Sequence, residues 1–306
     1  SIAFLLPVAV LGIVLTWRPA AAQWPMQYGD IAVTCQGLCG DPNAFVMGTI
    51  DVQNWNVPSN FNNSSWLSTP SLIYHHPSWT RANLGDIFGL CIDNSGNIFV
   101  TATAAYYDWC PGTFGPGGPG AVYKINGTTG AISLFATLPQ SSAAPSLGNI
   151  AHDKVNDQFF VTNFEDGKIY RISNAGVVST FLDPFGPDGG SPGAAPVGER
   201  LWGIAVYNGR VYFARWNEDR VNYSAAVANE IWSVPVTGGA PTLEVSTTAL
   251  GCPANSSAPI SDIAFSSGGR MLVAERGNES VTTGNNHFAR FLEYLPPTWA
   301  PSPPAF

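Results

Sequence analysis

Three polar side chains occupy the same place in a recurring apolar segment, and their chemistry suits a metal ion. Asp30, Asn149 and Asp262 are each followed directly by Ile-Ala. Carboxylate and amide oxygens are hard ligands, which Ca²⁺ and Mg²⁺ prefer and softer transition metals do not. If the fold brings the three side chains together, the sequence predicts a divalent cation site, with Ca²⁺ as the first candidate.

A second group of polar residues ends the strand-like stretch that follows each of the later segments. The group consists of Asn163, Arg215 and Glu275. Antiparallel pairing would return these residues to the end at which Asn149 and Asp262 begin, so we predict a binding mouth there. Glu275 would be its general base if the protein is an enzyme. The alternative is structural, with the same side chains capping turns and strand ends around a water-filled channel.

Other patterns of catalytic or ligand residues are weaker. The sequence has no G-x-S-x-G, H-E-x-x-H or G-x-x-x-x-G-K-[ST] motif. His75-His76-Pro77-Ser78-Trp79 offers metal ligands or a stacking surface, although a plain loop explains it as well. The acid pairs Glu165-Asp166 and Glu218-Asp219 are interpreted as turn or edge charges, because neighbouring strand residues point to opposite faces.

The elements that would position these residues are short antiparallel strands. Residues 158–173 read QFFVTNFEDGKIYRIS, in which two alternating stretches flank an Asp-Gly turn, and this pattern predicts a β-hairpin. Similar segments begin at Asp30, Gly89, Asn149, Gly203 and Asp262, at spacings of 59, 60, 54 and 59 residues. A repeat of this length is typical of a structural unit that stacks on its neighbours.

Each later unit continues through further strand-like stretches. The expected second strands are 98–102, 159–163, 211–215 and 271–275, the third strands are 121–125, 168–172, 230–234 and 288–294, and the fourth strands are 132–137 and 177–182. Four-stranded antiparallel units favour an all-β fold, a β-propeller of radially packed blades, with about five repeats visible. A β-sandwich would explain the alternation but would not explain the period.

The unit as a whole resembles repeats of the NHL type and of the senescence-marker and gluconolactonase family. The resemblance rests on the turn DNSGN and on the third strands VYKI, IYRI, IWSV and LEYL, and it extends from about residue 30 to 295. It implies a six-bladed ring and a metal-dependent lactonase, whose Asn and Asp ligands Asn149 and Asp262 match. The family's Glu in a Gly-Glu-Gly-Pro context is replaced here by Gly29-Asp30, which leaves the third ligand open.

Composition and charge exclude one class of partner. The 306 residues include 13 Lys and Arg against 21 Asp and Glu, and the resulting net charge of −8 repels nucleic acid and anionic membrane surfaces. A hydrophobic fraction of 45% supplies material for a core, while 32 Gly and 25 Pro favour short strands and tight turns over helices.

The beginning of the sequence has the pattern of a signal peptide. An apolar run from Ile2 to Leu15 precedes Ala20-Ala21-Ala22, an A-x-A cleavage site, and the run is short for a membrane span. An uncleaved anchor helix is the alternative. The expected domains are a signal peptide at 1–22, the propeller at 23–295, and a Pro-rich linker or the start of a further region at 296–306. After cleavage we expect no membrane insertion.

Export would permit disulfides and glycans. Among Cys35, Cys39, Cys91, Cys110 and Cys252, we expect Cys35 to pair with Cys39 and Cys91 to act as a small buried hydrophobe. The N-x-[ST] sequences that begin at Asn126, Asn222, Asn255 and Asn278 mark surface loops.

The sequence thus predicts a secreted or cell-surface propeller that binds a protein, a glycan or a small-molecule ligand at its mouth without catalysis. The alternative is a gluconolactonase-type hydrolase, in which a divalent cation would polarise an ester carbonyl. Five prolines after Leu295 predict that the last unit lacks a fourth strand. We therefore expect an incompletely closed ring with an exposed sheet edge.

Overall fold

The chain folds almost entirely into β-structure. The computed structural model describes residues 29–34, 40–51, 73–104, 112–140, 146–186, 195–196, 198–216, 228–248, 256–276, 278–279 and 289–301. The short helix α1 (Arg81–Leu84) interrupts the strands in these segments. The expected signal peptide, the Cys35–Cys39 pair and the Glu218-Asp219 pair lie outside the described residues. In the part of the chain that is described, no helix has the length and apolar character needed to cross a membrane.

Four antiparallel sheets have four strands each, and consecutive strands in the chain are neighbours in each sheet. The sheets are β4 (Ile87–Ile92), β5 (Ile98–Ala102), β6 (Ala121–Ile125) and β7 (Ile132–Thr137); β8 (Leu147–Asp153), β9 (Gln158–Asn163), β10 (Lys168–Ser173) and β11 (Val178–Leu182); β12 (Arg200–Tyr207), β13 (Arg210–Trp216), β14 (Glu230–Pro235) and β15 (Thr242–Ser246); and β17 (Ile260–Phe265), β18 (Met271–Arg276), β20 (Ala289–Leu295) and β21 (Ala300–Pro301).

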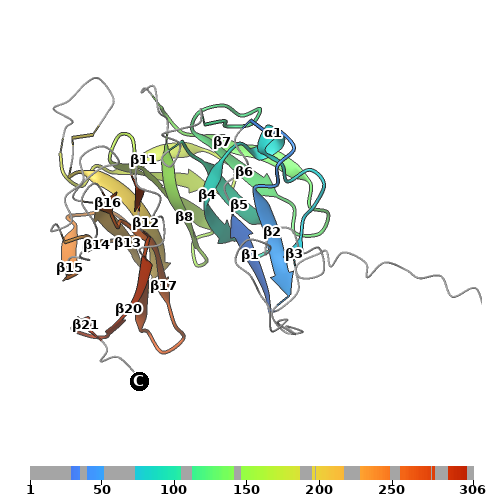
Figure 1. Ribbon diagram of the computed structural model, residues 1–306. Coiled ribbons are helices and arrows are strands. Elements are labelled where there is room, and N and C mark those ends of the chain that lie inside the picture. The colour runs from blue at the N-terminus through green and yellow to red at the C-terminus, as the bar shows by residue number, and fades with distance from the viewer. Residues whose placement is uncertain are drawn as a thin grey trace, which may run out of the picture.

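Two smaller sheets complete the described structure. A three-stranded sheet contains β1 (Asp30–Thr34), β2 (Met47–Asp51) and β3 (Ile73–Tyr74), and a two-stranded ribbon pairs β16 (Ser256–Ser257) with β19 (Asn278–Glu279). The first strands of successive sheets pack against one another, β1 on β4, β4 on β8, β8 on β12 and β12 on β17. Figure 1 shows these sheets following one another around the molecule. This radial arrangement of antiparallel blades is a β-propeller, so the predicted fold class is confirmed.

The core lies between neighbouring blades, which explains why the strands are apolar on both faces. Phe159 packs on Phe99 of the preceding blade, with 4.3 Å between ring centroids, whereas Phe160 joins the cluster that contains Phe213 of the following blade. All four side chains are fully buried. Burial of each such side chain stabilises the fold by about 2–3 kcal/mol. Cys91 packs against the same cluster as Phe99, as expected for a small hydrophobe.

The last blade corrects the prediction that prolines prevent a fourth strand. β21 pairs antiparallel with β20, and Tyr294 lies opposite Pro301. Pro301 is on the outermost strand of the sheet, where the missing N–H need not face a neighbour. No contact comparable to those between successive blades joins β17 to β1 within the described segments, which agrees with the expected open edge between the first and last sheets.

The first sheet corrects the alignment of the repeat. Thr34 Oγ1 in β1 donates to the Phe88 carbonyl at 2.9 Å, as Thr101 Oγ1 in β5 donates to the Gly148 carbonyl at 2.7 Å. β1 is therefore equivalent to the second strand of the next blade, and the sequences GDIAVT and GNIFVT match accordingly. Asp30 consequently does not share a position with Asn149.

Candidate functional site

Four inner strands carry an irregularity at the same place, and the predicted ring positions lie on it. The pairing with the second strand shifts between Ile87 and Leu90, Leu147 and Ile150, Leu201 and Ile204, and Ile260 and Asp262. The residues at or within these bulges include Gly89, Asn149, Gly203 and Asp262. A bulge redirects a side chain relative to the regular strand alternation.

Two of these positions are glycines because the blades approach closely there. A Cβ at Gly89 would lie 2.6 Å from Thr101 Oγ1 and 2.7 Å from Asn149 Cα. A Cβ at Gly203 would lie 3.0 Å from the Ile260 carbonyl oxygen. Any side chain at Gly89 would displace the backbone of the next blade. The inner strands therefore leave little free space at this level.

Threonine hydroxyls link one blade to the next across this narrow zone. Thr162 Oγ1 donates to the Trp202 carbonyl at 2.5 Å and accepts from the Asn149 amide at 3.1 Å. Thr101 makes the same pair of bonds, since it accepts from the Gly89 amide at 2.9 Å and donates to the next blade. Both threonines are fully buried, so these hydroxyls satisfy backbone groups that the bulges leave unpaired.

The structure brings Asn149 and Asp262 together, as predicted. Asn149 Nδ2 donates to Asp262 Oδ1 at 2.9 Å, although the two residues belong to blades separated by a third. Asn149 Oδ1 accepts from the backbone amides of Ile150 at 2.8 Å and Leu90 at 3.2 Å. The side chain thus joins three blades, and both ends of its amide are engaged.

Asp262 is the ionisable residue among the four bulge positions Gly89, Asn149, Gly203 and Asp262. The residue is exposed, but the surrounding protein replaces much of the bulk water, and this desolvation raises the pKa of the carboxyl to about 6. The hydrogen bonds from the Ile263 amide and from Asn149 favour the carboxylate and only partly offset this effect. Asp262 therefore changes charge in mildly acidic solution.

The residues of the predicted cation site do not fit a Ca²⁺ ion. The oxygen of Asn149 already accepts two backbone hydrogen bonds, and its amide nitrogen faces Asp262. Asp30 begins β1, whereas Thr34 at the other end of β1 contacts the inner strand of the neighbouring blade. Four strand residues span roughly 13 Å, which separates Asp30 from that level. Within the described residues, no group of three or more His, Cys, Asp or Glu is placed to hold a metal ion.

Asn163, Arg215 and Glu275 occupy equivalent ends of second strands, as predicted, but each has structural partners. They lie opposite Leu147, Leu201 and Ile260. Asn163 Nδ2 donates to the Pro139 carbonyl at 3.1 Å, and Arg215 Nε donates to the Gly198 carbonyl at 2.5 Å. Glu275 Oε1 accepts from Asn229 and Thr247, at 3.2 and 3.1 Å.

These contacts fasten each second strand to a segment that precedes its own blade in the chain. Glu275 also forms an ion pair with Arg290 on the adjacent strand and is almost fully buried. Arg215 forms an ion pair with Glu230 at 3.1 Å. A carboxylate with this set of donors is a poor acceptor for a substrate proton, so the geometry gives Glu275 a structural role.

The acid pair Glu165-Asp166 lies in the turn between β9 and β10, as expected, but both residues are buried. Glu165 and Asp166 are 2% and 7% exposed. Asp166 Oδ2 accepts from the Tyr170 hydroxyl at 2.6 Å, and its Oδ1 accepts from the Lys168 amide at 3.0 Å. The turn is covered by the segment that leads to the next blade, since the Ala195 amide donates to the Glu165 carbonyl.

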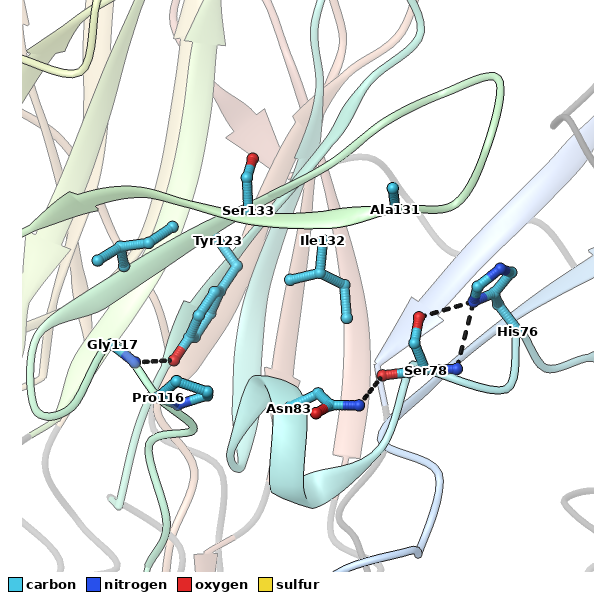
Figure 2. Close-up of a pocket in the computed structure, with 10 residues that line it drawn as sticks. His76, Ser78, Asn83, Pro116, Gly117, Tyr123, Ala131, Ile132 and Ser133 are labelled. Carbon is cyan, nitrogen blue, oxygen red and sulfur yellow. Dashed lines mark hydrogen bonds between the residues drawn. The ribbon is translucent and has the colours of Figure 1, made fainter.

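A pocket lies at the periphery, beside the outermost strand of the first four-stranded blade (Figure 2). Its volume is about 600 Å³, and its lining is mostly apolar. The lining residues are His76, Ser78, Asn83, Pro116, Gly117, Tyr123, Ala131, Ile132, Ser133 and Leu134. The wall formed by residues 76–83 includes part of the histidine segment singled out in the sequence, so that segment lines a cavity.

Polar groups at the pocket are held in fixed positions. The Ser78 amide donates to His76 Nδ1 at 3.2 Å, so a neutral ring carries its proton on Nε2. Asn83 Nδ2 donates to the Ser78 carbonyl at 2.9 Å, and no described residue donates to Asn83 Oδ1. The Tyr123 hydroxyl is used internally, because it donates to the Phe114 carbonyl at 2.5 Å and accepts from the Gly117 amide at 2.8 Å.

Comparison with known proteins adds no family. No protein-family model matches the chain, and no curated protein matches it. A nidogen/laminin complex gives a TM-score of 0.48 at 11% identity, over 87% of this chain and 85% of that chain. A streptogramin B lyase gives 0.39 at 14% identity, over 82% and 62%. A catalytically inactive virginiamycin B lyase from Staphylococcus aureus with quinupristin gives 0.40 at 16% identity, over 85% and 69%.

Structural similarities with TM-scores and sequence identities this low support no conclusion about activity. The assignment of the fold therefore rests on the sheets and their packing. Sequence reasoning missed the pocket, because its walls come from a loop, a Gly-Pro turn and an edge strand that are not contiguous in the chain. A usable signal was present in β7, where the apolar Ile132 and Leu134 flank the polar Ser133 on a strand that ends its blade.

Proposed function

We propose that this protein is an exported binding module without catalytic activity, and that it binds its partner in the peripheral pocket. The observation that carries the proposal is the pocket itself. It has a volume of about 600 Å³, a mostly apolar lining and a few fixed polar groups. Ligand sites commonly have volumes of about 300–1,000 Å³ and this composition.

The hydrogen bonds formed by residues of the axial mouth support a binding site away from the axis. Glu275, Asn163 and Arg215 bind neighbouring segments, and Asn149 uses both ends of its amide. These contacts support a structural role for residues that the hydrolase alternative would need for catalysis. The net charge of −8 favours a protein, glycan or small-molecule partner over nucleic acid.

A binding screen with pocket variants tests the proposal. The full chain is offered a glycan array, a phage-displayed peptide library and a metabolite set read by thermal shift, each with and without Ca²⁺. Leu134→Arg places a long cation at the pocket, whereas Leu243→Arg places it at the equivalent position of another blade. We expect binding that Leu134→Arg abolishes and Leu243→Arg preserves. Binding that both variants leave intact would place the site elsewhere.

The hydrolase alternative has its own measurement. Lactone hydrolysis is followed with a panel of substrates in the presence of Ca²⁺, for the wild type and for Glu275→Gln and Asp262→Asn. We expect no turnover above background. Turnover that both substitutions remove, in proteins that remain folded, would make the protein an enzyme and overturn the proposal.

Export is tested independently of binding. Expression of the complete gene in its natural host and sequencing of the mature N-terminus should give a chain that starts at Gln23, because the A-x-A pattern ends at Ala22. A cytoplasmic product that retains residues 2–15 would contradict export.

A further inference from the structure

We propose that the pocket receives alternate aliphatic side chains of an extended peptide whose backbone pairs with the free edge of β7. This inference rests on the proposed function and specifies its ligand. The pocket lining includes Ile132 and Leu134, two residues apart on β7. Leu134 is 52% exposed, so part of its apolar side chain is available for contact with a ligand.

The backbone of β7 offers hydrogen-bonding groups at these same two residues. The Asn126 amide donates to the Ala131 carbonyl at 2.9 Å, which makes this the first hydrogen-bonded pair of the hairpin. Opposed residues of antiparallel strands alternate between hydrogen-bonded and non-hydrogen-bonded pairs. Ile132, opposite Ile125, and Leu134, opposite Tyr123, are therefore non-hydrogen-bonded to β6. Their N–H and C=O groups point away from the sheet.

No described strand covers this edge. β7 is the last strand of its sheet, and no described residue hydrogen-bonds to the backbone of Ile132 or Leu134 from outside. The free edge is short. Its far end is closed at Phe135, because a Cβ at Gly176 of the next blade would lie 2.5 Å from the Phe135 carbonyl oxygen. The accessible stretch coincides with the part of β7 that lines the pocket.

The geometry of strand addition connects the free edge to the pocket. An added strand would lie about 4.8 Å from β7, and residues directly opposite each other in an antiparallel pair have their side chains on the same face. Figure 2 shows the Ile132 side chain pointing toward the pocket and the Ser133 side chain pointing to the opposite face of the strand. Peptide residues opposite Ile132 and Leu134 would therefore place their side chains over the pocket.

These features define the chemistry of the ligand. The backbone edge requires an extended peptide, which a glycan does not imitate, and the mostly apolar lining favours aliphatic side chains at alternate positions. The net charge of −8 would slow the approach of an acidic peptide and would speed the approach of a peptide with basic flanks.

The structure supplies a matched control for the edge. Leu243 in β15 lies opposite Trp232, directly before a register shift, just as Leu134 lies opposite Tyr123 directly before a register shift. Both side chains are exposed, at 45% and 52%. The β15 edge belongs to a different blade.

The test separates the side chain from the backbone donor. Peptides are selected from a random library displayed on phage, and their affinity is measured for the full chain and for Leu134→Ala, Leu134→Pro, Leu243→Ala and Leu243→Pro. Both Leu134 variants lose the side chain, but only proline also loses the outward N–H. We expect selected peptides with aliphatic residues at alternate positions. We expect Leu134→Pro to bind roughly fivefold more weakly than Leu134→Ala, and the Leu243 variants to bind like the wild type.

N-methylation of the selected peptide gives a second measurement if Leu134→Pro does not fold. Methylation at the alternate positions that face β7 should weaken binding, and methylation at the positions between them should not. Equal binding by the two Leu134 variants, or equal effects of both methylation patterns, would refute edge pairing but leave the pocket as the binding site. A glycan that binds in a Leu134-dependent manner, with no peptide selected, would also refute the inference while supporting the proposed function.

Discussion

Replacement of Glu275 distinguishes a structural carboxylate from a catalytic one. Its side chain is 1% exposed, and it accepts hydrogen bonds from Asn229 and Thr247 and forms an ion pair with Arg290. Removing one partner of a buried ion pair costs about 3–5 kcal/mol. Because the Arg290 side chain is partly exposed and regains some hydration, we expect Glu275→Ala to lower the free energy of unfolding by about 2–4 kcal/mol.

Two further variants make the measurement specific. Glu275→Gln keeps an oxygen for Asn229 and Thr247 and should lose about half as much stability, since a hydrogen bond to a charged group is worth about 1.5–3 kcal/mol and one to a neutral group about 1 kcal/mol. Glu293→Ala breaks the ion pair between β20 and Arg270, which directly precedes β18, and should cost less than about 1 kcal/mol. The assay is urea unfolding followed by tryptophan fluorescence. A loss below about 1 kcal/mol for Glu275→Ala would refute the structural role.

Three other predictions follow from the inner strands. Gly89→Ala should destabilise the fold by about 1–3 kcal/mol through overpacking, whereas Gly268→Ala, whose Cβ would meet only Ser266 Oγ at 3.9 Å, should be nearly neutral in thermal unfolding. Thr162→Val should lower stability in urea unfolding by about 1–3 kcal/mol, because it leaves a buried carbonyl and a buried amide unpaired. The pKa of Asp262 is raised by folding, so its carboxyl stabilises the fold at acidic pH and loses that contribution as the pH rises toward about 6. The melting temperature of Asp262→Asn, relative to that of the wild type, should therefore increase from pH 4 to pH 7. A difference in melting temperature that does not change with pH would contradict the raised pKa of Asp262.

Strand positions were predictable where hydrophobic alternation and turn residues agree. The expected strands 98–102, 121–125 and 132–137 match β5, β6 and β7 residue for residue. β15, with the sequence TLEVS, was missed, because it is short and half polar and pairs as an outer strand. β21 was rejected on its prolines, although an outer strand tolerates them. Sequence pattern thus identified the outer strand β7 as well as the inner strands, and it failed at outer strands that are short and polar or contain proline, where pairing with one neighbour decides.

Two of the three residues predicted to meet do so, and the misplacement of the third has a geometric cause. Asn149 and Asp262 meet because both lie on bulges of inner strands, whereas Asp30 was aligned by its Ile-Ala neighbours and belongs to a second strand. The residues at the ends of the second strands were expected to converge. Successive strand residues face opposite sides, however, so Asn163 turns away from the side on which Thr162 contacts the next blade.

The same inner strands explain why we place the proposed binding site at the rim. Glycine at two of the four bulge positions lets neighbouring backbones come within the distance at which a Cβ would collide, and buried threonine hydroxyls hold the blades together there. Asn149 then spans the axis to Asp262 and fixes three blades at once. Because Asn149 uses both ends of its amide within the protein, this level offers a ligand few free groups. The outer edge of β7, by contrast, combines outward backbone groups with an apolar cavity, and this combination makes it the better place to bind a partner.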